Sequence, residues 1–141
     1  MNSQESKTLA SLFLGVARLV RGEIKHGGNG PCLTEIQIHA LLYIKDEQPN
    51  MRELAKRLAI TPPSTTVLIQ SLMAQKLVTR KTNRQDARIS QIVITAEGLK
   101  LLKKRFDVLS KSIGHILDAL PARDRNTLSH LLKRIITAHE A

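Results

Sequence analysis

The sequence predicts a mainly α-helical fold with one small β-hairpin, an α+β arrangement in a single domain. Three observations predict this class. Apolar residues recur at helical spacing through much of the 141-residue chain. A Thr–Pro pair marks the start of a helix near the middle of the chain. A β-branched run over residues 89–95 follows a basic, turn-rich stretch, and two extended runs around such a stretch indicate a hairpin.

The helix in the middle of the chain is expected to begin just after Thr61. A threonine side chain accepts hydrogen bonds from the free N–H groups of a first helical turn. Pro62 suits the first helical position because its missing N–H would be unpaired there. Four residues then recur at i, i+3, i+4 and i+7, which predicts that they face the core: Thr65, Leu68, Ile69 and Leu72.

The opposite side of this helix has no acidic residue and few large side chains. It is formed by Pro63, Ser64, Thr66, Val67, Gln70, Ser71 and Ala74. Such a face can approach phosphates: Gln can pair with adenine, Ser and Thr can bind a base or a phosphate, and valine methyls can contact a thymine methyl. Taken alone, the pattern also fits an ordinary solvated helix face.

The predicted hairpin concentrates positive charge at its tip. Its first strand starts at Leu77 and Val78, and its tip has one acid, Asp86, among four basic residues: Arg80, Lys81, Arg84 and Arg88. Asp86 precedes Arg88 by two residues, close enough in a hairpin to hold the guanidinium in one orientation. A pre-oriented arginine suits insertion into a DNA minor groove, where negative potential is focused. A solvated turn with incidental charge is the alternative.

Charge is unevenly distributed along the chain. The net charge is +10, and residues 61–105 contain nine basic residues against two acidic ones. A polyanion is therefore the expected partner. A membrane surface would attract the same charge, but it normally requires an amphipathic helix with aromatic anchors or a lipid signal, and neither is evident. No apolar run is long enough to cross a membrane and no signal peptide is evident, so we expect a cytoplasmic protein without a membrane partner.

Two shorter helices are expected before the central one. Thr34, with Gln37 three residues on, predicts a capping box at the start of the first, which ends before Pro49 and Asn50. Its inner face is expected to be Ile36, Ala40, Leu41 and Ile44. The second, supported by Met51, Leu54, Ala55 and Leu58, should expose three basic residues where a helix can cross a DNA backbone: Arg52, Lys56 and Arg57.

Amphipathic helices are expected at both ends of the chain. One covers about residues 8–25, after a frayed polar start over residues 1–6. Another starts at Ala96, and its apolar residues step by three and four: Leu99, Leu102, Phe106, Leu109, Ile113, Ile116 and Leu120. Pro121 interrupts it, and a last helix starts at about Arg123. A small domain cannot cover so long a seam alone, so these helices are expected to form a two-fold dimer arm.

This order of elements resembles the MarR-type transcription regulators over about residues 33–105. The resemblance is carried by the Thr-Pro-Pro-Ser helix start, the Leu-Val strand, the basic hairpin with Asp86, Ala87 and Arg88, and the following Ile-Thr-Ala-Glu-Gly-Leu-Lys-Leu-Leu. It implies a winged helix-turn-helix over 33–95, with dimerisation helices at 7–26 and 96–139. It further implies that the Thr61-led helix lies in the major groove and that the wing reaches the minor groove or the backbone.

The resemblance also implies a homodimer on palindromic double-stranded DNA, released by a small molecule or by oxidation. We expect a repressor, since blocking a promoter requires only occupancy. The chain departs from the family at Lys76, where glycine is usual, at Ala59, where glycine is frequent, and at Val67, where a polar base-reading residue is usual. A left-handed backbone at Lys76 would carry modest strain that glycine avoids. Oxidative control through Cys32 is an alternative, although no activating cation lies near it in the sequence.

Other functional classes find less support in the sequence. The five histidines show no metal-ligand pairing at i, i+4 with an acid, and His39 is expected beside the core; no serine lies in a nucleophile elbow. We therefore expect no enzyme, no cofactor and no metal. The glycine-rich stretch at 27–31 lacks the flanks of a nucleotide site and is interpreted as a connector. A basic RNA- or ribosome-binding module is the alternative, but RNA readers commonly stack bases on aromatic residues, which are only 2% of this chain.

Overall fold

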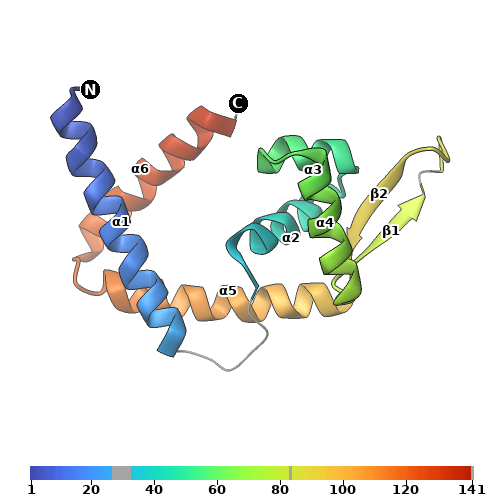
Figure 1. The fold of residues 1–141 in the computed structure, drawn as a ribbon. Helices are drawn as coiled ribbons and strands as arrows, with labels where there is room; N and C mark the ends of the chain where they lie inside the picture. The colour runs from blue at the N-terminus through green and yellow to red at the C-terminus, as the bar shows by residue number, and fades with distance from the viewer. Residues whose placement is uncertain (27–32, 83, 141) are drawn as a thin grey trace. The chain divides into compact units, whose positions relative to one another are not determined.

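A computed structural model of the chain describes residues 1–26, 33–82 and 84–140. These residues form six α-helices and one two-stranded antiparallel sheet (Figure 1), so the predicted mainly α class with a single hairpin is confirmed. The elements are α1 (Ser3–His26), α2 (Glu35–Glu47), α3 (Met51–Leu58), α4 (Pro62–Ala74), β1 (Val78–Thr82), β2 (Ser90–Ile94), α5 (Ala96–Leu117) and α6 (Ala122–Glu140). The chain divides into two compact units, one from residues 30–106 and one from residues 1–29 and 107–141.

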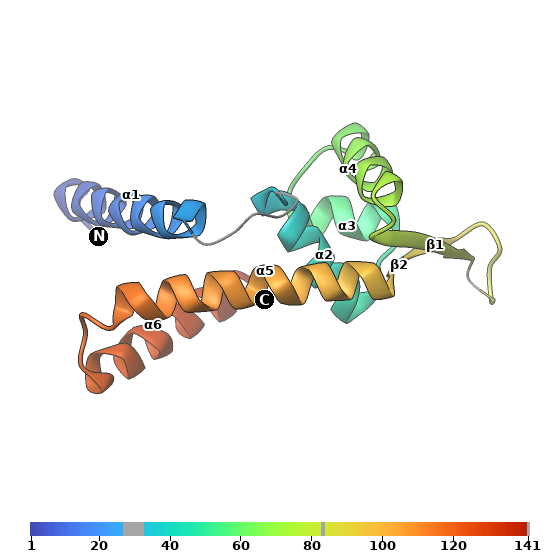
Figure 2. The same cartoon turned by 90° about the horizontal axis from the view of Figure 1, so that it is seen from below.

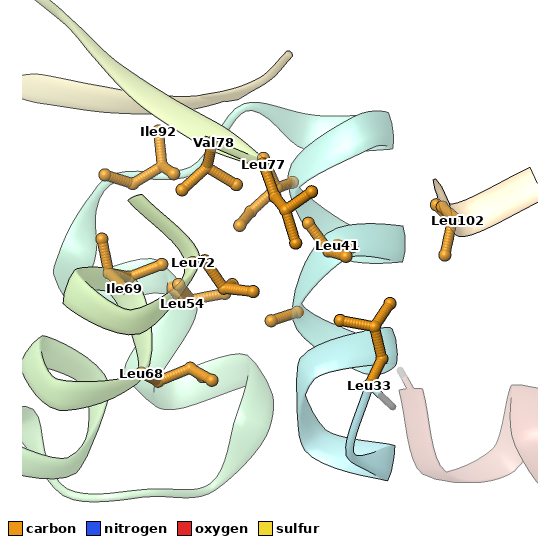
Figure 3. Packing of buried hydrophobic residues seen from close by; sticks show 12 residues of the cluster. Leu33, Leu41, Leu54, Leu68, Ile69, Leu72, Leu77, Val78, Ile92 and Leu102 are labelled. Atoms are coloured by element: carbon orange, nitrogen blue, oxygen red, sulfur yellow. The ribbon is translucent and has the colours of Figure 1, made fainter. Parts of the chain in front are cut away.

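The hydrophobic core lies in the 30–106 unit, where α4 packs its inner side against α3 and β1 (Figure 3). The four residues predicted for that side of α4 are all buried: Thr65, Leu68, Ile69 and Leu72. Their neighbours in the core come from every other element of this unit: Leu41, Ile44, Leu54, Val78, Ile92 and Leu102. The core fixes which side of α4 remains on the surface.

Side-chain caps start the helices of this unit. The Thr61 hydroxyl accepts the Ser64 N–H at 3.3 Å, as predicted for the start of α4. Thr34 and Gln37 form the complete capping box expected for α2, with Thr34 accepting at 3.3 Å and Gln37 at 2.9 Å. Asn50 caps α3 by accepting the Glu53 N–H at 2.8 Å, a cap that was not predicted. Local polar side chains therefore set the three starts.

Two sequence-based expectations about helices are wrong. Residues 3–6 belong to α1 and are not frayed, because the Asn2 side chain accepts the Glu5 N–H at 2.7 Å and caps the helix. Ile36 does not belong to the inner face of α2: its side chain is exposed, while Ala40, Leu41 and Ile44 are buried as expected.

Three helices of the 30–106 unit are followed by a residue in the left-handed backbone conformation. Ala59 and Lys76 have φ values of 53° and 61°. The left-handed backbone considered for Lys76 is therefore present, and that of Ala59 was not predicted. Gln48, with φ 46°, was not predicted. Left-handed conformations favour glycine because a Cβ adds steric cost, yet none of the three residues is glycine.

The wing projects from the helices of this unit as a short ribbon (Figure 1). β1 and β2 pair antiparallel, from Val78 opposite Ile94 at the base to Thr82 opposite Ser90 toward the tip. At the base, the Thr95 hydroxyl donates to the carbonyl of Lys76 at 2.7 Å and accepts the Gly98 N–H at 3.0 Å. The start of α5 is thus hydrogen-bonded to the turn that follows α4.

The other unit contains α1, the second part of α5 and α6. α5 is one unbroken helix (Figure 2). A contact of 3.1 Å between His115 of α5 and Glu23 links it to α1. The apolar residues on α1 and α6 are largely exposed: Leu9, Leu12, Phe13, Val16, Leu19, Leu131, Leu132, Ile135 and Ile136. Among the described residues of α6, none is buried.

Candidate nucleic-acid interface

The outer side of α4 is entirely solvent-exposed. All seven residues predicted for it are exposed: Pro63, Ser64, Thr66, Val67, Gln70, Ser71 and Ala74. Because the core holds the opposite side of the helix, this face is presented by a rigid element rather than by a loop. Residues 62–94 contain five basic residues and only one acid, so no carboxylate on α4 opposes the approach of a phosphate.

Hydrogen bonds within α4 occupy several of these polar groups. The Thr61 hydroxyl donates to the Ser64 Oγ at 2.9 Å, and the Thr66 hydroxyl donates to the carbonyl of Pro62 at 3.1 Å. The Ser71 Oγ accepts weakly from Gln75 at 3.4 Å. By contrast, the Gln70 side chain has no hydrogen bond to any residue that the structure describes. Gln70 therefore keeps its full donor and acceptor pair for a ligand.

At the wing tip, one carboxylate holds one arginine. The Asp86 Oδ1 accepts the backbone N–H of Arg88 at 3.0 Å and the Arg88 Nε–H at 3.2 Å, so the predicted contact between the two residues is present. The Arg88 side chain is 91% exposed while that of Asp86 is 37% exposed, so the guanidinium stays accessible to a ligand although it is paired. The three other basic residues predicted for the tip are also exposed: Arg80, Lys81 and Arg84.

Basic residues of α3 add a third exposed element. Arg52, Lys56 and Arg57 are exposed, as predicted. The Arg57 guanidinium carbon lies 5.5 Å from the centroid of the Tyr43 ring of α2, a cation–π contact that was not predicted. Arg57 is therefore held against its own domain, unlike its two neighbours on α3.

In the described part of the chain, no group of three or more His, Cys, Asp or Glu residues is placed to hold a metal ion. The expectation that His39 lies beside the core is wrong, because its side chain is 62% exposed. Its Nε2 lies 3.7 Å from a carboxylate oxygen of Glu35, one helical turn earlier. Cys32 and the glycine-rich stretch at 27–31 lie outside the described residues. Across the described ranges, no helix is long and apolar enough to cross a membrane.

The arrangement of the helices and wing matches known proteins. Across 100% of this chain and 99% of its own, a MarR family protein from Bacillus stearothermophilus superposes with a TM-score of 0.82 at 15% sequence identity. The MarR family model matches residues 33–89, which contain α2, α3, α4 and most of the wing. Residues 33–89 match the MarR family, and the chain has the winged-helix fold of a MarR family protein.

Two further similar proteins are named for what they do or bind. The chain is 28% identical to the HTH-type transcriptional regulator MhqR of Bacillus subtilis, and the match covers 79% of the chain and 74% of MhqR. MepR of Staphylococcus aureus is similar in structure at 20% identity and 92% coverage of this chain. A MepR mutant bound to an oligodeoxyribonucleotide gives a TM-score of 0.64 over 96% of its chain, and MepR bound to ethidium bromide gives 0.65 over 94%.

Proposed function

We propose that this chain is a homodimeric transcription repressor that binds palindromic double-stranded DNA. In this proposal α4 lies in the major groove, and the wing places Arg88 in the adjacent minor groove or against the backbone. The observation that carries the proposal is the combination of an exposed, acid-free α4 face with an exposed arginine held by Asp86. The MepR mutant bound to an oligodeoxyribonucleotide supports DNA as the partner.

A second copy of the chain is the proposed occupant of the exposed apolar faces of α1 and α6. Large apolar side chains that are exposed to water favour association. On α1 and α6 such side chains recur along the whole helix, whereas on a typical monomer surface they are scattered singly. A two-fold dimer presents two α4 helices to two half-sites of an operator about one helical turn apart, roughly 34 Å. The operator is then expected to be palindromic.

We also propose that a small molecule releases the protein from DNA in the cytoplasm. MepR bound to ethidium bromide supports a small organic effector in a protein of this fold. A free energy of coupling of about 1–3 kcal/mol between effector and DNA corresponds to a roughly 5–150-fold loss of DNA affinity.

A competition between two nucleic acids tests the proposal. The protein is titrated against a short palindromic duplex, selected from a random pool, and against a structured RNA of equal charge. Fluorescence anisotropy at two salt concentrations gives both affinities and their salt dependence. We expect clear preference for the duplex, with one dimer bound per palindrome. Preference for the RNA would instead favour an RNA-binding module.

Replacing Arg88 with alanine is expected to weaken binding to specific and random duplexes alike. The guanidinium is proposed to contact phosphate or the minor groove, so its loss removes about one counterion from the salt dependence and lowers the slope of log K against log salt by about one. Arg84→Ala is expected to act in the same way. Arg123→Ala, which removes the same charge near the start of α6, is the control and should leave both quantities unchanged.

Replacing Gln70 with alanine is expected to change sequence preference instead. Loss of a bidentate amide–adenine pair costs about 1–3 kcal/mol at one base pair and leaves random duplex binding nearly unaltered. The measurement is the affinity of both proteins for operators with each position of a half-site changed in turn. Equal losses for Gln70→Ala and Arg88→Ala on specific and random DNA would contradict this division between α4 and the wing.

A further inference from the structure

The outer side of α4 carries the apolar side chain of Val67, which is 66% exposed. A single exposed apolar residue is common on proteins. At this place, however, the usual reasons for a valine are missing. The side chain is outside the core, and a β-branched residue lowers helix stability relative to alanine or a long polar residue. Neither packing nor helix propensity therefore accounts for Val67.

Two hydroxyl protons at this face are already used. Thr61 and Thr66 donate theirs within α4, to Ser64 and to the carbonyl of Pro62. Ser64 and Ser71 only accept hydrogen bonds within the described chain and keep their protons, while Gln70 offers an amide and Val67 an apolar group on the same exposed face. Gln70 and Val67 lie three residues apart, a rise of about 4.5 Å along a helix, which is between one and two base-pair steps of about 3.4 Å.

We propose that Val67 reads the 5-methyl group of a thymine in each half-site, close to an adenine bound by Gln70. This inference rests on the proposed function. Thymine presents a methyl group in the major groove, where apolar side chains distinguish it from other bases. A helical valine strongly prefers one χ1 rotamer, so its two methyl groups are fixed before contact and lose little freedom on binding. The same contact would favour DNA over RNA of equal sequence, since uracil lacks the methyl group.

A uracil scan of the selected operator tests the inference. Each thymine is replaced by uracil, symmetrically in both half-sites, which removes the methyl group and retains base pairing. For the unaltered protein we expect one thymine per half-site whose replacement weakens binding about fourfold per half-site, the effect of burying one methyl-sized group. Val67→Ala should bind the thymine operator more weakly by a similar factor and show no further loss on the uracil operator.

Two outcomes would overturn the inference while leaving DNA binding intact. One is equal affinity of the unaltered protein for the parent operator and every uracil variant. The other is a uracil penalty that persists in Val67→Ala, which would assign methyl reading to another residue. Gln70→Ala is the matched control, because it should weaken binding but keep the uracil penalty. Failure to bind any duplex in the pool would overturn the proposed function and this inference together. The scan of the unaltered protein requires no variant to fold.

Discussion

Replacing Gly98 with alanine is expected to destabilise the protein by about 3 kcal/mol, at the upper end of the cost of overpacking. A Cβ at this position would collide with the carbonyl oxygen of Leu77, lie 3.1 Å from the carbon of that carbonyl and lie 2.7 Å from Cγ1 of Ile94. The Leu77 carbonyl accepts the Thr95 N–H at 3.0 Å, so it is backbone that is already fixed and cannot move aside without cost.

The measurement for Gly98→Ala is urea unfolding followed by circular dichroism, at a fixed protein concentration because the proposed dimer would add a concentration-dependent stability. Gly114→Ala in the same helix is the matched control. A Cβ there meets nothing within 4 Å in the described chain, so alanine should stabilise the protein by about 0.5–1 kcal/mol through helix propensity. Equal shifts for the two variants would show that the close approach of α5 to Leu77 is not required.

Replacing Ile69 with alanine is expected to lower the free energy of unfolding by about 2–5 kcal/mol. Ile69 is fully buried on the inner side of α4, and truncation leaves a cavity in the hydrophobic core of this unit. Thermal and urea unfolding check the result. Gln70→Ala, one residue further along on the exposed side, is the control and should stay within about 0.5 kcal/mol of the unaltered protein. A small loss for Ile69→Ala would contradict the assignment of the two sides of α4.

The two sides of α4 were predictable because they depend on local rules. Helical spacing separated Thr65 and Leu68 from Val67 and Gln70, and Thr61 followed by Pro62 fixed the helix start to the residue. The pairing of Asp86 with Arg88 was predictable for the same reason, since two residues separate the partners. Structural features that depend on residues close together in the chain can therefore be predicted from the sequence.

Features that depend on distant or competing contacts were missed. The hydrogen bond from the Thr95 hydroxyl to the Lys76 carbonyl joins residues 19 positions apart, and no local sequence pattern predicts it. The close approach of Gly98 to Leu77 also requires the tertiary fold. Hydroxyl groups on α4 were predicted as free donors for DNA, but the structure directs the Thr66 hydroxyl to the backbone, a choice that sequence spacing alone does not reveal.

The hydrogen bonds behind α4 have a consequence for local unfolding. Leu77 donates its N–H to the Leu72 carbonyl at 2.9 Å, its own carbonyl accepts from Thr95, and Thr95 also binds Lys76. The last turn of α4 therefore cannot fray by itself, because its opening also breaks the pairing at the start of α5. Helix end, ribbon base and α5 start are expected to open as one cooperative unit, with amide protons that exchange together rather than in sequence along the helix.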